Sequence, residues 1–218
     1  MPMKVLVIGA HGRTGQRVVR RLRQGAHEPV AMIRDVTQRA IFDELAVPTV
    51  LADLEYPIDH AVAGCDAVIF AAGSGGRTGK DKTVLIDHLG AIRSMVAAAM
   101  NGAGRYVMLS AVGAVPDSDS RIRHYHRAKA HADAFLRTMD QVMERSLEWS
   151  IVCPGGLTDE PGTGKVSVGD DLHVTGQTSR DNLAHALTAC LDEPATIGKQ
   201  FTLLDGDTPM GDALRSLP

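Results

Sequence analysis

The amino-acid sequence predicts an α/β protein with a doubly wound, mostly parallel sheet and helices on both faces. The first observation is a series of short apolar runs, many rich in Val and Ile, that fit strands buried on both faces. The second is that segments with helical periodicity separate these runs, which favours right-handed crossovers between parallel strands. The third is length, because 218 residues can bury a full core, and we expect one domain over residues 1–218.

Four strands and three helices are expected in the first half of the chain. Met3–Ile8 is a β-branched run that stops at Gly9, and the helix that follows ends before Gly25, a residue typical of helix C-termini. In order, the elements after the first strand are a helix at 13–24, a strand at 29–33, a helix at 37–46, a strand at 49–51, a helix at 58–63 and a strand at 67–70.

The second half continues the alternation. A helix over 81–101 carries Leu85, Leu89 and Ile92 on one stripe, and Gly102 closes it. The later elements are a strand at 106–109, a helix at 121–143, a strand at 149–152, a helix at 180–191 and a strand at 200–204. Residues 155–178 are rich in glycine and polar side chains, so we expect a loop or small lobe there instead of a second domain.

Composition excludes several classes of protein. Hydrophobic residues make up 44% of the chain and charged residues 22%, and the net charge of -3 argues against a nucleic-acid partner. Apolar runs such as Ala67–Gly73 are too short for a membrane span, and Met1–Ile8 leads into a strand without a signal-peptide pattern. Cys65, Cys153 and Cys190 show no metal or disulfide spacing. We therefore expect a cytoplasmic protein with no metal site, as a monomer or homodimer.

The turn after the first strand carries three glycines before the helix begins. Gly9 permits a tight turn, Gly12 lets backbone N–H groups approach a phosphate, and Gly15 lets the helix pack closely on the strand. A pyrophosphate on this turn would lie at the positive end of the helix dipole. The pattern predicts a dinucleotide site formed by Gly9, His11, Gly12, Arg13, Thr14 and Gly15.

A second small-residue segment follows the strand at 67–70. Ligands of open α/β sheets bind at the carboxyl edge, where this segment must lie. We expect Ala71, Ala72 and Gly73 to let the ribose and adenine of a dinucleotide lie against the backbone, although an ordinary flexible loop explains the same residues.

The end of the second strand bears on the choice of cofactor. An acidic residue there would bind the free ribose of NAD, whereas an arginine would pair with the 2′-phosphate of NADP. Arg34 occupies that position and predicts NADP, with Arg13 as a second cation nearby. A shift of one residue would place Asp35 there and favour NAD, and Arg34 would then be a surface residue.

Tyr125 and Lys129 are four residues apart on the expected helix at 121–143, so they lie on one helix face. The ammonium of Lys129 would lower the pKa of the Tyr125 hydroxyl. A tyrosine tuned in this way can exchange a proton with an alcohol or carbonyl group, and Lys129 can also reach the ribose of a nicotinamide. A surface Tyr-Lys pair is the alternative interpretation.

The glycine spacing and the Tyr125–Lys129 pair together resemble the short-chain dehydrogenase/reductase superfamily. The chain is most similar to its atypical NAD(P)-binding members of about this length, often labelled NAD-dependent epimerase/dehydratase. The resemblance covers almost the whole chain and implies an NAD(P)-binding Rossmann fold. It also implies that 155–178 lies on the substrate side, and that lobe is too short for a large nucleotide-sugar.

Further site residues follow from this resemblance. Asp53 would contact the adenine amino group with Leu54 beside it, although Asp53 also fits a helix N-cap. Ser110 would be the third catalytic residue, but Ala111 stands where that serine is usual, so a full triad is in doubt. The chain around the nicotinamide would consist of Pro154, Gly155, Gly156 and Leu157.

Three functions fit these residues. The first is an NADP(H)-dependent oxidoreductase that acts on a small carbonyl or alcohol compound, with Tyr125, Lys129 and Ser110 as catalytic residues. The second is a sensor that binds NADP(H) and signals to a partner without catalysis, which would not need the Tyr125–Lys129 pair. The third is an epimerase or dehydratase in which the hydride leaves and returns to one substrate.

Overall fold

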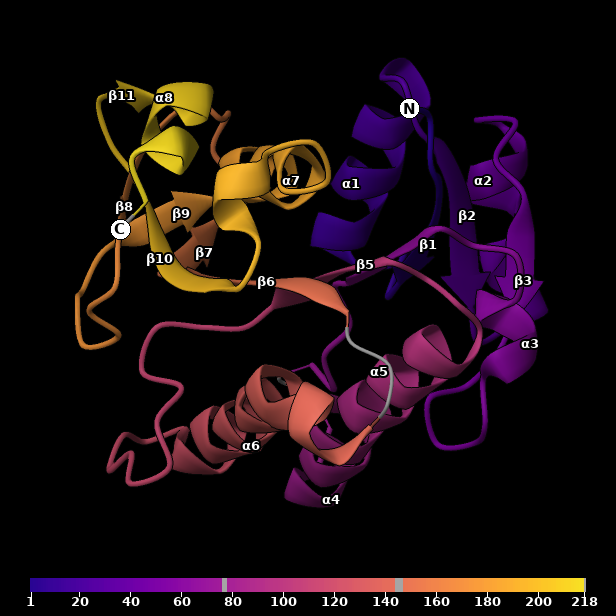
Figure 1. Cartoon of the computed structure of the whole chain (residues 1–218), viewed down its shortest axis with the longest axis horizontal. Helices are drawn as coiled ribbons and strands as arrows, with labels where there is room; N and C mark the ends of the chain where they lie inside the picture. The colour runs from indigo at the N-terminus through magenta and orange to yellow at the C-terminus, as the bar shows by residue number, and fades with distance from the viewer. Residues whose placement is uncertain (76–77, 144–146, 218) are drawn as a thin grey trace.

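The computed structural model describes residues 1–75, 78–143 and 147–217, and a sheet of nine strands runs through them (Figure 1). In chain order the strands are β1 (Lys4–Ile8), β2 (Glu28–Ile33), β3 (Thr49–Leu51), β4 (Ala67–Phe70), β5 (Arg105–Leu109), β6 (Glu148–Pro154), β8 (Lys165–Gly169), β10 (Lys199–Asp205) and β11 (Thr208–Pro209). Their order across the sheet is β11-β8-β10-β6-β5-β4-β1-β2-β3. Only the pairings of β8 with β10 and with β11 are antiparallel among these described strands, so the predicted mostly parallel sheet is confirmed.

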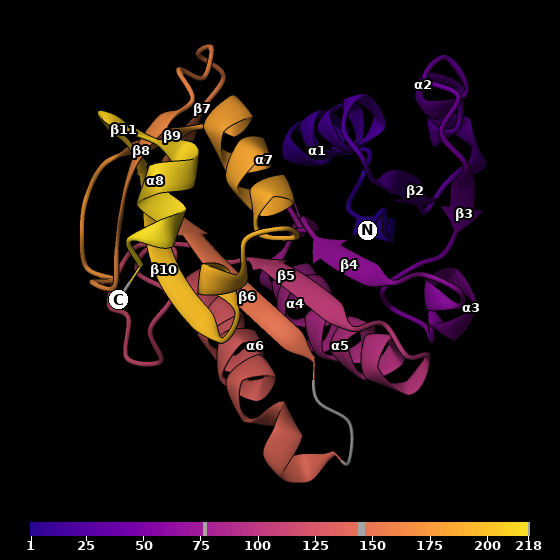
Figure 2. The same cartoon turned by 45° about the horizontal axis from the view of Figure 1, so that its top comes forward.

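Helices cover both faces of the sheet. They are α1 (Arg13–Gln24), α2 (Ala40–Asp43), α3 (Asp59–Val62), α4 (Lys80–Lys82), α5 (Ala91–Met100), α6 (Arg123–Val142), α7 (Arg180–Ala189) and α8 (Met210–Arg215), with 3-10 turns at Val36–Gln38 and Pro194–Thr196. Figures 1 and 2 show α1 and α7 side by side on one face, and α4, α5 and α6 on the other. The chain is therefore doubly wound, as predicted.

The alternation of side chains along β1 explains this layering. Val5 and Val7 belong to the core beneath α1 and α7, whereas Leu6 and Ile8 belong to the core beneath α5 and α6. All four side chains are fully buried. Burial of such a side chain stabilises the fold by about 1.5–3 kcal/mol, so a β-branched run this apolar is stable only between two helical layers.

The helix expected at 37–46 is wrong as a single element. The structure has the 3-10 turn Val36–Gln38 followed by the four-residue helix α2. The carboxylate of Asp35 accepts a hydrogen bond from the backbone N–H of Thr37, and Ala46 ends the segment with a φ of 51°. Local side-chain capping and a left-handed residue thus divide a segment whose apolar spacing alone fits one helix.

The helix expected at 81–101 contains a π-helical segment, Thr83–Gly90, between α4 and α5. Within the described residues, Lys80–Met100 is the one stretch long and apolar enough to cross a membrane by composition, and 56% of its most apolar part is buried in the protein. Met95 and Ala98 of this stretch are fully enclosed in the core against β4 and β5, which identifies it as a core helix.

Three short strands lie in the region expected to be a loop or small lobe at 155–178. Besides β8, strands β7 (Gly156–Thr158) and β9 (Gln177–Ser179) pair in parallel as a separate two-stranded sheet. Strand β8 alternates exposed Lys165, buried Val166 and exposed Ser167, and it pairs with β10. A strand this short gains its stability from pairing with β10, and the residues near β8 in the sequence do not indicate that partner.

The order of strands fixes where a ligand can bind. β1 lies between β2 and β4, because the chain runs outward to β3 and then crosses back to start β4 beside β1. The connections after β1 and β4 therefore leave the sheet in opposite directions at its carboxyl edge. Such a switch point opens a crevice at the sheet edge.

Candidate active site at the carboxyl edge of the sheet

The turn from β1 into α1 can be built only with glycine at two positions. Gly9 has a φ of +81°, and a Cβ there would lie 2.6 Å from the Cα of Ala72. A Cβ on Gly15 would lie 2.1 Å from the carbonyl oxygen of Gly9. These contacts allow no side chain, so the turn after β1, the segment after β4 and the first turn of α1 meet backbone to backbone. This cradle fits the close approach that a dinucleotide phosphate requires.

The N-terminus of α1 is available to an anion. Gly12 is the N-cap residue, and among the described residues no side chain caps the helix there. The N–H of Gly12 donates to the carbonyl oxygen of Gly9 over 3.0 Å, which closes the turn. His11 is exposed beside it and Thr14 is buried. Uncapped N–H groups in the first turn are the donors that a pyrophosphate uses.

Arg13 does not stand alone at this edge. Its guanidinium lies 2.5 Å from the carboxylate of Asp159, which follows β7. Arg180, at the start of α7, lies 3.0 Å from the same carboxylate, and Arg17 lies 3.5 Å from it. Arg17 also pairs with Asp181 at 2.7 Å. The phosphate turn is thereby tied to the segment after β7.

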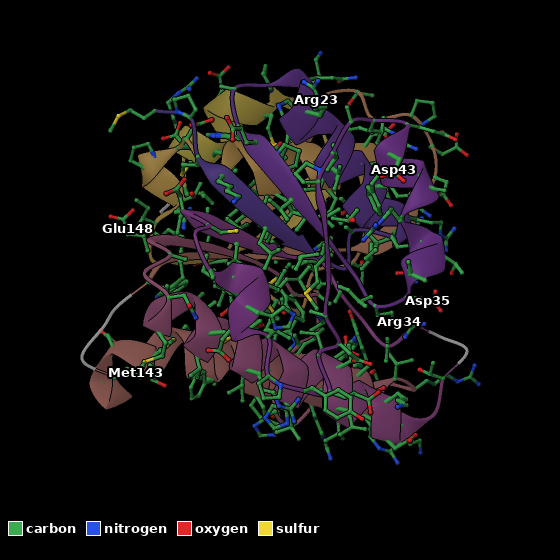
Figure 3. All side chains as sticks on the ribbon, turned by 90° about the vertical axis from the view of Figure 1, so that its right-hand side faces the viewer. Arg23, Arg34, Asp35, Asp43, Met143 and Glu148 are labelled. Atoms are coloured by element: carbon green, nitrogen blue, oxygen red, sulfur yellow. The ribbon has the colours of Figure 1, made fainter. Side chains whose placement is uncertain are left out.

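The two residues that follow β2, Arg34 and Asp35, differ in their hydrogen bonds. The carboxylate of Asp35 accepts hydrogen bonds from the N–H and hydroxyl of Thr37 at 2.8 and 2.7 Å, which lowers the pKa of Asp35. Arg34 is exposed, and its guanidinium forms no hydrogen bond with any residue that the structure describes. Figure 3 shows Arg34 and Asp35 together at one edge of the sheet, away from Glu148 at the start of β6.

Asp53 and Leu54 form the turn after β3. The carboxylate of Asp53 accepts from the N–H of Glu55 at 3.0 Å, so it caps this turn and not helix α3, whose N-cap is Ile58. Leu54 is buried, and a Cβ on Gly90 would lie 3.0 Å from its side chain. Leu54 thus holds the π-helical segment close to the expected adenine position.

The segment after β6 is largely satisfied by the protein. The N–H of Gly155 donates to the hydroxyl of Thr178 at 3.0 Å, and the N–H of Gly156 donates to Gly176 O at 2.9 Å. Pro154 O accepts from the N–H of Val112 at 3.0 Å. The Gly156 N–H is therefore not free for a carboxamide, and Gly156 and Leu157 are the exposed residues of this segment.

Tyr125 and Lys129 lie together on α6, as their spacing predicts. Lys129 is 1% exposed, and its ammonium donates to Leu109 O at 3.0 Å and to Ala72 O at 3.4 Å. The ammonium also lies 5.9 Å from the centre of the Tyr125 ring. Tyr125 is half-buried. The pair therefore sits beneath the segment after β4, which includes Ala72 and Gly73 of the expected dinucleotide site.

The electrostatics of this pair differ from the expectation in their net effect. Burial raises the pKa of Tyr125, the ammonium of Lys129 opposes that rise, and the carboxylates of Asp87 and Asp133 add to it. The net direction is upward. Burial alone would lower the pKa of Lys129, but Tyr125 and the same two carboxylates outweigh it and raise that pKa. Lys129 stays protonated, and its charge keeps the rise at Tyr125 smaller than burial alone would produce.

Ser110 lies at the end of β5, where it is 1% exposed. Its hydroxyl donates a hydrogen bond to the Oδ2 atom of Asp133 at 2.5 Å. The hydrogen that a catalytic serine would offer to a substrate is thus directed into the protein. Cys153 next to it is fully buried, and burial raises the pKa of its thiol to about 12.

Two residues outside the predicted set of catalytic and cofactor-binding residues complete this cluster. Asp87, in the π-helical segment, lies 3.5 Å from the ammonium of Lys129 and accepts from the N–H of Ser74 at 2.9 Å. Asp133 is one helical turn beyond Lys129 and fully buried. The spacing of Tyr125, Lys129 and Asp133 at every fourth residue was the signal that could have found Asp133.

Comparisons with known proteins identify the family of this chain. A family profile described as NAD(P)H-binding matches residues 9–194. A Bacillus subtilis protein named as the uncharacterised sugar epimerase YhfK is 42% identical over an alignment that covers 99% of this chain and 100% of that protein.

Solved structures extend the likeness to three dimensions. A Bacillus halodurans protein, described provisionally as an NAD-dependent epimerase/dehydratase, superimposes with a TM-score of 0.91 at 41% identity, covering 99% of this chain and 100% of that one. The oxidoreductase ylbE of Lactococcus lactis gives a TM-score of 0.83 at 26% identity over 98% of this chain and 96% of its own. These matches confirm the predicted family, in which the relatives are named as epimerases, dehydratases or oxidoreductases. The chain therefore belongs to the NAD(P)H-binding family of atypical short-chain dehydrogenase/reductases.

Proposed function

We propose that the chain is an NADP(H)-dependent oxidoreductase that reduces a small carbonyl compound or oxidises the corresponding alcohol. The observation that carries the proposal is the Tyr125–Lys129 pair. Tyr125 is half-buried, and Lys129 is buried with its ammonium beside the backbone of Ala72. A nicotinamide bound at this edge supplies or accepts the hydride. Tyr125 gives its hydroxyl proton to the carbonyl oxygen, or takes one from the alcohol, and Lys129 limits the cost of the tyrosinate that forms.

The choice of NADP rests on the end of β2. One oxygen of the Asp35 carboxylate, Oδ1, accepts both hydrogen bonds from Thr37, whereas the guanidinium of Arg34 is exposed. An exposed guanidinium suits a 2′-phosphate, and the bonds from Thr37 hold the Asp35 carboxylate within its own turn. Both arguments favour NADP(H) over NAD(H).

Ser110 has a supporting part in this proposal. Its hydroxyl hydrogen is bonded to Asp133 and its side chain is 1% exposed, so Tyr125 and Lys129 carry out the proton transfer.

The segment 155–178 forms the wall of the substrate site in this proposal. A cytoplasmic location stays a prediction.

The substrate class is the next question for experiment. An azoreductase of Xenophilus azovorans that uses NAD(P)H is 27% identical over 69% of this chain and 47% of its own length. This relative adds azo dyes to the acceptors worth trying, beside aldehydes, quinones and flavins. Loss of NADPH absorbance with each acceptor measures turnover.

Tyr125→Phe is the decisive variant in that assay. It should lower turnover by about 100-fold to 10,000-fold, the range typical of general acid–base catalysis, and change NADPH affinity by less than about threefold. Tyr56→Phe, at a side chain 67% exposed, is the matched control and should retain full activity. Full activity in Tyr125→Phe removes the catalytic assignment.

An epimerase or dehydratase is the second candidate, because relatives of 42% and 41% identity carry those names. In such a reaction the hydride returns to the substrate from which it came. Product would then form without net consumption of NADPH, whereas the oxidoreductase consumes one NADPH for each product molecule. The ratio of cofactor consumed to product formed separates the two.

A further inference from the structure

Asp133 is a buried carboxylate with no assigned role in the proposed reaction. It follows Tyr125 and Lys129 at intervals of four residues along α6, so the three side chains form one stripe facing the sheet. Its side chain is 0% exposed. A carboxylate buried this deeply is costly unless its charge and oxygens are satisfied.

The two oxygens of Asp133 have unequal surroundings. Oδ2 accepts from the hydroxyl of Ser110 at 2.5 Å and from the side-chain amide of Gln200 at 3.2 Å. Oδ1 has no hydrogen-bond partner among the residues that the structure describes. The same Gln200 amide lies 3.6 Å from the thiol of Cys153, and Arg137 donates to the oxygen of Gln200. The carboxylate therefore holds two polar groups at once with a single oxygen.

The groups that face Asp133 come from four elements, but only α6 supplies charged ones, Lys129 and Arg137. The thiol of Cys153 on β6, the hydroxyl of Ser110 just after β5 and the amide of Gln200 on β10 are neutral. Lys129 is in turn 3.5 Å from Asp87. The ammonium of Lys129 thus interacts electrostatically with two buried carboxylates, those of Asp87 and Asp133. All three charges act on the pKa of Tyr125.

We propose that Asp133 is a positioning residue for the proposed reaction, holding the Ser110 hydrogen inside the protein and sharing with Asp87 the charge of Lys129. The inference rests on the proposed function and names a further residue of the same site. Ser110 can then only accept a hydrogen bond from a bound molecule, and cannot polarise a substrate carbonyl. The negative charge of Asp133 also makes Tyr125 hold its proton more firmly until an oxygen of the substrate takes it.

The first test measures Tyr125 directly, without cofactor or substrate. Fluorotyrosine, whose phenol is more acidic than that of tyrosine, is incorporated at all tyrosines, and Tyr125→Phe assigns the signal in the fluorine NMR spectrum. Asp133→Asn should lower the pH midpoint of that signal by about one pH unit, a tenfold change in ionisation constant. Asp140→Asn, an exposed carboxylate on the same helix, is the matched control and should leave the midpoint in place.

The second test keeps the charge at Asp133 and therefore does not depend on the stability of Asp133→Asn. NMR of carboxyl-labelled aspartate follows the titration of Asp133, whose pKa burial raises to about 6 against the opposing hydrogen bond from Ser110. Ser110→Ala should raise that midpoint by about one pH unit. An unchanged midpoint in Ser110→Ala, or an unchanged Tyr125 signal in folded Asp133→Asn, overturns the inference. Neither result bears on turnover, so the proposed function stands or falls separately.

Discussion

The ammonium of Lys129 lies 3.5 Å from the carboxylate of Asp87, and the two side chains are 1% and 0% exposed. This ion pair joins α6 to the π-helical segment Thr83–Gly90, which also holds the backbone of Ser74 through the same carboxylate. A π-helical segment shifts the residues after it around the helix, and such segments are frequent at functional sites. The pair therefore links the proposed proton-transfer residues to the segment on which a dinucleotide would rest.

Removing one partner of this pair should destabilise the fold. Lys129→Met leaves the carboxylate of Asp87 buried without its cation, and we expect a loss of about 3–5 kcal/mol in the free energy of unfolding, measured by urea denaturation. Lys80→Met, at an exposed lysine, should change it by less than about 0.5 kcal/mol. The double variant Lys129→Met with Asp87→Asn should recover part of the loss, and strict additivity would argue against the pair.

Gly15 should tolerate no side chain. In Gly15→Ala the new Cβ would lie 2.1 Å from Gly9 O, so the phosphate turn must move, and we expect NADPH affinity to fall at least tenfold with about 1–3 kcal/mol of lost stability. Gly104→Ala is the matched control, since a Cβ there meets no atom within 4 Å. Equal NADPH titrations for the two variants would contradict the backbone-to-backbone packing at this turn.

Arg34 should discriminate between the two nicotinamide cofactors. Loss of a charged hydrogen bond to a phosphate costs about 1.5–3 kcal/mol, so Arg34→Ala should weaken NADPH about 10-fold to 100-fold and leave NADH unchanged. Arg23→Ala, which lies away from Arg34 in Figure 3, should affect neither cofactor. Fluorescence titrations of each protein with both nucleotides give the dissociation constants, and parallel weakening of NADH in Arg34→Ala would assign Arg34 a different role.

Asp133 should make stability depend on pH. Its pKa is about 6 in the folded protein against 3.8 as the ordinary value, with burial as the main cause. A raised carboxyl pKa contributes stability that is present below the unfolded value and is lost as the pH rises through about 6. Relative to Asp133→Asn, the wild type should therefore gain about 2–3 kcal/mol between pH 7.5 and pH 4. A difference in unfolding free energy that stays constant over this range would place the Asp133 pKa near its ordinary value.

The sequence was sufficient for the elements whose signal is local. The apolar run of β1, its Gly9 and the helix ending before Gly25 carry periodicity and capping information within a few residues. Strand β8 carries only a short alternation over Lys165–Gly169, and its stability comes from pairing with β10 more than 30 residues away. The π-helical segment was missed for a related reason: the predicted stripe of Leu85 and Leu89 assumes α-helical register, but in the structure Leu89 is 37% exposed and Asp87 is buried.

The residues of the candidate site show the same difference between local and long-range signals. Tyr125 and Lys129 were readable from one helix, and the glycines from one turn. Asp87 and Gln200 come to the site from the π-helical segment and β10, so only the folded chain brings them to Lys129 and Asp133. The direction of the Ser110 hydroxyl likewise depends on a partner 23 residues away. The proposed proton-transfer residues were therefore predictable from the sequence, whereas tertiary packing determined their hydrogen bonds and electrostatic environment.

Cofactor binding by the purified protein tests the central claim most directly. NADPH fluorescence, titrated at constant ionic strength and repeated with NADH, measures both affinities on the same sample. We expect saturable binding of one NADPH per chain, with NADH binding more weakly. Absence of saturation with either nucleotide would contradict the phosphate cradle at Gly9 and Gly15, and with it the role given to Tyr125.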